Sequence, residues 1–124
     1  MAVIRVHTDL DVYKSSFESA MEIFEWSKKF PKSEQYSLTD QIRRASRSVS
    51  VNIAEAWRHR RYSKLFISKL SIAEGEAAEV QVWLDFALAC DYIESDMRNL
   101  LIEKYDHIIG KIVNMINNPE NWVL

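Results

Sequence analysis

Residues 38–58 read LTDQIRRASRSVSVNIAEAWR, a stretch in which apolar side chains recur at three- and four-residue spacing. In an α-helix this spacing gathers the apolar side chains on one face and leaves the polar ones on the other. The apolar face consists of Ile42, Ala45, Val49, Ile53 and Ala56. Several of these side chains are small, so a neighbouring helix can approach closely. We predict an amphipathic helix that begins near Ser37 or Thr39 and ends near Arg60.

Three further segments have the same periodicity. We predict helices from about Leu10 to Lys29, from Ser63 to about Cys90, and from near Ser95 to about Asn117. Side-chain oxygens at predicted N-caps can accept hydrogen bonds from the free amides of the first turn; these N-caps are Asp9, Ser37 and Ser63. The predicted core faces consist of Leu10, Tyr13, Phe17, Met21 and Phe24 in the first helix, Phe66, Leu70, Ala73, Ala77, Val80, Leu84 and Ala87 in the third, and Met97, Leu101, Tyr105, Ile108, Ile112 and Met115 in the fourth.

The small number of turn-forming residues in the chain favours long helices over strands. The chain has 124 residues, which fits one domain, with two glycines and two prolines. Sheet proteins need many turns, and turns need these residues. Short connections make consecutive helices antiparallel neighbours. We therefore predict an all-α fold, an antiparallel up-down-up-down four-helix bundle that forms a single domain over residues 1–124. Gly75 lies inside the third helix at a cost of about 1 kcal/mol, so we expect a close helix contact there.

Two of the predicted helices have more apolar side chains than one core face can hold. Those outside the predicted core faces are Val12, Ile23, Trp26 and Phe30 on the first helix, and Ile72, Val82, Trp83, Phe86 and Cys90 on the third. Large exposed apolar patches usually mark interfaces. We predict a homo-oligomer whose interface includes Trp26, Phe30, Trp83 and Phe86. Two alternatives are that the assumed helix phases are wrong, or that Trp26 and Phe30 fold over a loop.

The sequence contains no recognisable catalytic or metal-binding constellation. His7, His59 and His107 lie on different segments and form no HxxxH or HExxH pair. The chain also lacks a CxxC pair and a glycine-rich phosphate loop. Cys90 ends an apolar stripe, and we expect it to be a small buried side chain. We predict no enzymatic activity, no metal, no cofactor and no small-molecule substrate.

The sequence also bears on the cellular location of the protein. A single cysteine suits the reducing cytosol. No apolar run approaches the roughly 20 residues of a membrane span. The segment from Met1 to Asp9 has no long apolar stretch and no cleavage signal. We expect a cytoplasmic protein that begins at Met1 and makes no membrane contact.

Positive charge is concentrated in one segment. Between Arg43 and Lys69 there are eight Lys or Arg residues and one acid, Glu55, so this segment carries +7 and the rest of the chain −9. On a helix, six positions of this segment fall within about 80° of one another over about 27 Å. They are Arg43, Arg47, Ser50, Ala54, Arg58 and Arg61, and Arg60 and Lys64 can extend the row.

Arginine can hold a phosphate with two hydrogen bonds, so these cationic side chains are candidate contacts to an RNA backbone. The candidate nucleic-acid-binding residues are Arg43, Arg47, Arg58, Arg60, Arg61 and Lys64. One alternative is a solvated helix face. Another is that the arginines pair with Glu18, Glu22 and Glu25 of a neighbouring helix or subunit.

The segments LTDQIRRA (38–45) and SVSVNIAE (48–55) resemble the signature of a bacterial four-helix-bundle family. The family is named after proteins encoded in intervening sequences of 23S rRNA genes. DLDVY (9–13), Phe30-Pro31 and LSIAEG (70–75) extend the resemblance over nearly the whole chain. Two features depart from the family pattern: Ala56-Trp57-Arg58 replaces a glycine-containing turn, and Glu76 follows Gly75 where serine is common.

The resemblance implies a four-helix bundle and ring-shaped homo-oligomers, with pentamers as the expected form. Most members have no assigned function, and the gene context implies a link to rRNA. A distant branch of the family serves diversity-generating retroelements as an accessory protein that binds nucleic acid and a reverse transcriptase. We therefore expect an RNA-binding or ribonucleoprotein-associated accessory protein. The alternatives are a protein-interaction scaffold with no nucleic-acid role, and an enzyme or small-ligand carrier.

Overall fold

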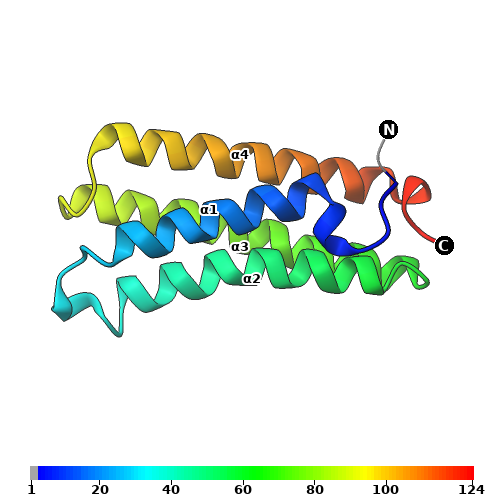
Figure 1. Cartoon of the computed structure of the whole chain (residues 1–124), viewed down its shortest axis with the longest axis horizontal. Coiled ribbons are helices and arrows are strands. Elements are labelled where there is room, and N and C mark those ends of the chain that lie inside the picture. Colours follow the sequence, from blue (N-terminus) through cyan, green and yellow to red (C-terminus); the bar gives the residue numbers. More distant parts are fainter. Residues whose placement is uncertain (1–2) are drawn as a thin grey trace.

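The computed structural model describes residues 3–124, which form four long helices and three short 3-10 helices and contain no strand (Figure 1). The long helices are α1 (Asp11–Ser27), α2 (Leu38–Arg58), α3 (Ser63–Ala89) and α4 (Ser95–Asn117), and the short ones are η1 (His7–Asp9), η2 (Lys32–Glu34) and η3 (Pro119–Asn121). The four long helices agree with the predicted ones to within a few residues. The expectation that the chain begins at Met1 concerns a residue outside the described range.

The helices form one bundle in chain order. Figure 1 shows that successive connections lie at alternate ends, and that the C-terminal end of the chain lies beside the α2–α3 connection. Each helix packs on its neighbours in the chain, and α1 also packs on α4. Short connections make consecutive helices antiparallel neighbours. The predicted all-α four-helix fold is confirmed. No helix in residues 3–124 is both long and apolar enough to cross a membrane.

The ends of the helices differ from prediction in how they are capped. The carboxylate of Asp9 accepts the backbone N–H groups of Arg5 (2.9 Å) and Val6 (3.2 Å), so it closes η1 and does not cap α1. Ser37 occupies the N-cap position of α2, yet its hydroxyl donates to Glu34. Ser63 is the first residue of α3 rather than its N-cap. The predicted capping roles of Asp9, Ser37 and Ser63 were therefore wrong.

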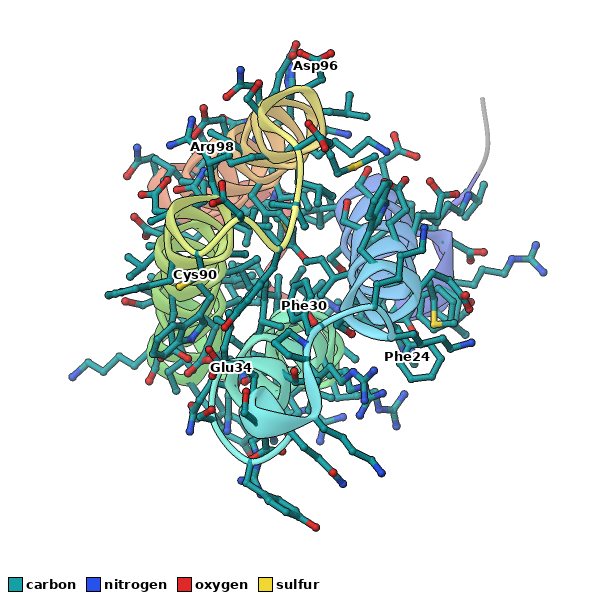
Figure 2. All side chains as sticks on the ribbon, turned by 90° about the vertical axis from the view of Figure 1, so that its left-hand side faces the viewer. Phe24, Phe30, Glu34, Cys90, Asp96 and Arg98 are labelled. Atoms are coloured by element: carbon teal, nitrogen blue, oxygen red, sulfur yellow. The ribbon has the colours of Figure 1, made fainter. Side chains whose placement is uncertain are left out.

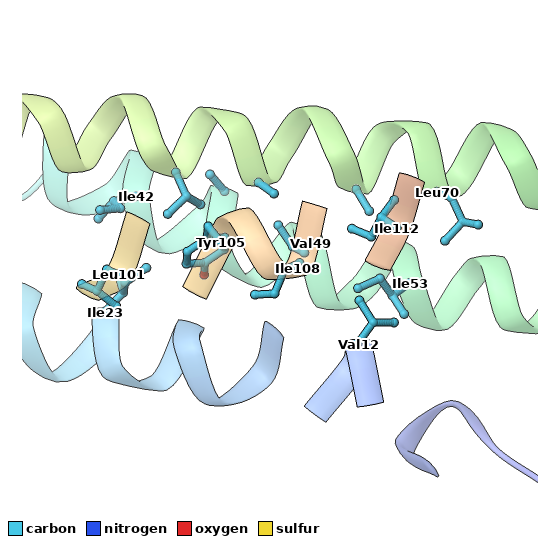
Figure 3. Close-up of a cluster of buried hydrophobic side chains, with 14 of the residues drawn as sticks. Val12, Ile23, Ile42, Val49, Ile53, Leu70, Leu101, Tyr105, Ile108 and Ile112 are labelled. Atoms are coloured by element: carbon cyan, nitrogen blue, oxygen red, sulfur yellow. The ribbon is translucent and has the colours of Figure 1, made fainter. Parts of the chain in front are cut away.

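The core lies between the predicted faces of three helices. Every predicted core residue of α2 and α3 is buried, and in α4 Met97 alone is partly exposed. Figure 3 shows these side chains meeting along the bundle axis. The largest fully buried side chains are Tyr105, Phe66, Ile23, Ile42, Ile53, Leu70, Leu84, Leu101, Ile108 and Ile112, with Val49 and Val80. Burial of apolar area at about 25 cal/mol per Å² is the main force that holds the bundle together.

The core face of α1 is not the predicted one. The prediction placed Tyr13, Phe17, Met21 and Phe24 inside, but Phe17 is 50% exposed and Met21 46% exposed. The buried row lies one residue earlier in the chain, which is about 100° around the helix. This row consists of Val12, Ser16, Ser19, Ala20, Ile23 and Ser27. Val12 and Ile23, predicted to lie outside the core, are therefore core residues.

Two hydrogen-bonded serines help to make this buried face of α1 possible. The hydroxyl of Ser16 donates to the carbonyl of Tyr13 (2.8 Å), and that of Ser27 donates to the carbonyl of Phe24 (2.9 Å). Ser16 Oγ also lies 2.8 Å from Ser50 Oγ of α2. Buried hydroxyls cost little when they are hydrogen-bonded, and their small size lets α1 lie close to α2. The larger aromatic side chains of α1 are consequently turned outwards.

Tyr105 carries a polar atom that the core leaves unsatisfied. Its side chain is fully buried, and within the described residues its hydroxyl has no hydrogen-bond partner. Burial raises the pKa of the phenol well above its usual range. Leaving a buried hydroxyl unpaired costs roughly 1–3 kcal/mol.

We expect Tyr105→Phe to raise the free energy of unfolding by about 1 kcal/mol, because the substitution removes an unpaired buried hydroxyl. Chemical denaturation measures the change. Tyr92→Phe is the matched control, since the Tyr92 hydroxyl donates to Glu34 (2.8 Å) and its removal is expected to destabilise the fold. A loss of stability in Tyr105→Phe as large as that in Tyr92→Phe would contradict the prediction.

Candidate nucleic-acid interface

The first two arginines of the predicted row lie together beside α1. Arg43 is partly buried, and its Nε donates to Ser27 Oγ (2.7 Å). The guanidinium carbon of Arg43 lies 4.8 Å from the centre of the Phe24 ring, and that of Arg47 lies 5.6 Å from it. An aromatic face attracts a cation at such distances. Phe24 therefore helps to hold both arginines along the edge between α1 and α2.

At Ser50, the middle of the predicted cationic row is buried, whereas the prediction placed it outside the core. Ser50 is 8% exposed, because α1 covers it and Ser16 hydrogen-bonds to it. Beside it an open groove of 570 Å³ lies between α1, α2 and η1. The groove is mostly apolar, and its lining residues are His7, Tyr13, Phe17, Ala20, Met21, Arg47, Ser50, Val51, Ala54 and Glu55. The cationic row is thus divided into two clusters with an apolar groove between them.

The second cluster lies at the end of α2 and in the turn to α3. The guanidinium of Arg60 lies 3.4 Å from the ring centre of Trp57, and its Nε donates to the carbonyl of the same residue (2.8 Å). The backbone N–H of Leu124 donates to the carbonyl of Arg60 (3.0 Å), which ties the C-terminal segment to this turn. Arg58 is exposed. Burial and the charge of Arg58 lower the pKa of Arg60, which still stays protonated at neutral pH.

Arg61 and Lys64 complete this cluster. Both side chains are exposed, and Tyr62 between them in the chain is 60% exposed. The cluster therefore combines cations with an exposed aromatic ring. Such a combination can contact both phosphates and bases of a nucleic acid.

The cationic side chains of the two clusters have no acidic partner in the part of the chain that the structure describes. Among residues 3–124, none of the six predicted binding residues forms an ion pair. Two of the acids proposed as partners are engaged elsewhere: Glu22 pairs with Lys104, and Glu25 with Lys28 (3.2 Å). The alternative of pairing within one chain therefore finds no support in the described residues. Pairing with a neighbouring subunit remains a prediction.

The predicted oligomer interface residues occupy two different settings. Trp26 and Phe30 are partly buried and pack against the core of their own chain. Trp83 is also partly buried, and its indole N–H donates to Glu79 Oε2 (3.2 Å). Phe86 is 53% exposed, and its ring centre lies 5.8 Å from that of Trp83.

The outer face of α3 is apolar in part. Its exposed apolar side chains are Ile72, Val82 and Phe86. Cys90 at its end is exposed, so its predicted burial was wrong. Figure 2 shows Cys90 and Phe24 on opposite sides of the bundle, so this face and the α1–α2 edge point in different directions.

Gly75 lies on the outer face of α3 without the contact that was expected. Among the described residues, no heavy atom outside its own stretch of helix lies within 4 Å of the position that a Cβ would take. The close helix contact predicted for Gly75 is therefore absent within residues 3–124. His107 is exposed, with Nε2 4.0 Å from a carboxylate oxygen of Glu103. Residues 3–124 contain no group of three His, Cys, Asp or Glu side chains that could hold a metal ion.

The groove between α1 and α2 was not foreseen from the sequence. The only signal was that α1 has apolar residues on two sides, and the wrong side was assigned to the core. Once Tyr13, Phe17 and Met21 are turned outwards, they meet Val51 and Arg47 of α2. The groove residues could be identified as apolar from the sequence, but their proximity to one another could not be predicted.

The fold and this surface define a helical-bundle protein with a cationic edge. The model of the family described as 23S rRNA-intervening sequence protein matches residues 8–114. The chain belongs to this family. A similar solved structure is a protein of unknown function from the S23 ribosomal protein family of Bacteroides thetaiotaomicron VPI-5482, with 27% identity and a TM-score of 0.78. The match covers 86% of this chain and 95% of that one. No curated protein matches the sequence.

Proposed function

We propose that the protein binds RNA as a non-enzymatic accessory component of a ribonucleoprotein. The observation that carries the proposal is that six cationic side chains on α2, in the α2–α3 turn and at the start of α3 form no ion pair within residues 3–124. Unpaired arginines favour an anionic partner, and the planar guanidinium group can donate two hydrogen bonds to one phosphate. The family description, which refers to 23S rRNA, supports RNA as that partner.

Such contacts would be made to the backbone, so binding is expected to tolerate changes of RNA sequence and to weaken with salt. Fluorescence anisotropy with a labelled RNA tests the proposal. With about four phosphate contacts, affinity should fall roughly 50-fold between 50 and 200 mM salt. Absence of binding at 50 mM salt would overturn the proposal.

We also propose that copies of the chain associate through the outer face of α3, in a ring such as the pentamer that the family resemblance implies. Ile72, Val82 and Phe86 expose apolar area there, and Gly75 leaves room for a helix of another copy. A patch of this kind usually marks an interface. A ring would repeat the cationic clusters and strengthen weak RNA contacts by avidity.

The same face supports the second candidate function, a protein-interaction scaffold without a nucleic-acid role. Light scattering coupled to gel filtration tests the association directly. A single species of 14.5 kDa at micromolar concentration would contradict self-association. Binding to RNA with the expected salt dependence would contradict the scaffold. The predicted cytoplasmic location is compatible with both functions and remains a prediction.

A further inference from the structure

The groove between α1 and α2 offers apolar and aromatic surface next to cations. The rings of Tyr13 and Phe17 lie 6.1 Å apart with planes inclined by 28°, and His7 packs edge-on against Tyr13 at 4.9 Å. Half of the Phe17 side chain is exposed. Met21 and Val51 continue the apolar surface. A flat apolar group can therefore lie on exposed rings that the fold already holds in place.

Cations lie at the edge of the same groove. Arg47 lines the groove, and Arg43 lies beside it on the shared Phe24 ring. Glu55 also lines the groove, but Lys69 Nζ lies 2.7 Å from its carboxylate and offsets its charge. The site therefore combines a surface for a base with free positive charge for a phosphate.

We infer that this groove takes unstacked bases, so that the preferred ligand of the protein is single-stranded RNA rather than duplex RNA. The inference rests on the proposed RNA binding and names its ligand class. A duplex stacks its bases on one another and offers proteins mainly backbone and hydroxyl groups. A single strand exposes base faces, and these stack on aromatic side chains with little regard to sequence. The apolar groove between two cationic clusters fits single-stranded RNA.

Phe17→Leu tests this inference, because leucine keeps an apolar side chain and removes the ring. Tyr36→Leu is the matched control, since Tyr36 is also an exposed ring (86% against 50% for Phe17) but lies between η2 and α2, away from the groove. The probes are a labelled 12-nucleotide single strand and a blunt duplex of equal length at the same salt concentration. We expect the wild type to prefer the single strand, and Phe17→Leu to lose about tenfold in affinity for it. Tyr36→Leu should bind like the wild type, and Phe17→Leu should bind the duplex unchanged.

Four results would overturn the inference. Equal affinity for both probes, or an unchanged affinity of Phe17→Leu for the single strand, would leave the proposed function intact and remove the role of the groove. Loss of self-association in Phe17→Leu with unchanged RNA binding would assign the groove to a second copy of the chain. Failure of the wild type to bind either probe would refute the proposed function itself, and the inference with it.

Discussion

Arg43→Glu combined with Arg47→Glu is expected to lower RNA affinity roughly hundredfold at 50 mM salt. Both arginines lie along the α1–α2 edge with no acidic partner among residues 3–124. Each phosphate contact that is lost should reduce the slope of log affinity against log salt by about one unit. The variant is therefore expected to bind more weakly and with a shallower salt dependence. Anisotropy titrations at several salt concentrations measure both quantities.

A matched pair of single variants separates the effect of position from that of charge. Arg44 and Arg47 are both exposed on α2, but Arg44 Nε lies 3.1 Å from a carboxylate oxygen of Asp40. Arg47→Glu should weaken binding clearly, and Arg44→Glu should weaken it much less. Equal losses would indicate a response to net charge alone and would contradict a defined binding edge.

The double variant also decides between RNA and a neighbouring subunit as the partner of these arginines. Arg43 contributes a hydrogen bond to Ser27 and a contact with the Phe24 ring, so some stability is expected to be lost. Circular dichroism should still show a folded helical protein. If the arginines bind RNA, the assembly state stays the same while RNA affinity falls. Dissociation into smaller species would instead show that they lie in a subunit interface.

Gly75→Leu is expected to convert the assembled protein to monomers without unfolding it. In residues 3–124, nothing outside its own stretch of helix lies within 4 Å of a Cβ placed at Gly75, so the larger side chain has space. Leucine is also a better helix former than glycine by roughly 0.8 kcal/mol, so the melting temperature of the chain should not fall. A helix of another copy packed closely over Gly75 would have to move away. Light scattering measures the loss of assembly.

Gly110→Leu provides the control for this prediction. Gly110 lies on the exposed side of α4, and it too has nothing within 4 Å of a Cβ position. The same chemical change is thus made on another helix, where assembly should persist. If Gly75→Leu remains fully assembled, the outer face of α3 is not the interface, and the proposed contact there is wrong.

Three helices could be predicted closely, and in two of them, α2 and α4, the reason is that the helix has one apolar face. In α2, the polar residues around Val49 and Ile53 leave one side that can be buried, and both side chains are fully buried. Ile112 lies on the corresponding face of α4, while Leu70 belongs to a row of apolar residues that runs unbroken along α3, and both are fully buried. Helical periodicity therefore specified the all-α class, the helix boundaries and most of the core. It also specified which cationic residues share a side of α2.

The orientation of α1 required the tertiary structure, because its sequence offers two apolar rows one residue apart. The larger side chains, such as Phe17, suggest one row by hydrophobicity, yet the bundle buries the row that contains Ser16 and Ile23. Close packing against Ser50 favours small side chains whose hydroxyls find partners nearby. Such complementarity between two helices cannot be read from either helix alone.

For the candidate site, too, some features follow from the sequence and others only from the tertiary structure. The sequence alone determined the four helices, their family and the concentration of positive charge on α2, since these depend on local periodicity and composition. Only the packing of α1 on α2 decided that Ser50 is covered and that the cationic row is interrupted. The same packing turned Tyr13 and Phe17 outwards to form a groove beside Arg47. A site shared by two helices depends on their relative rotation, which is set by how their side chains fit.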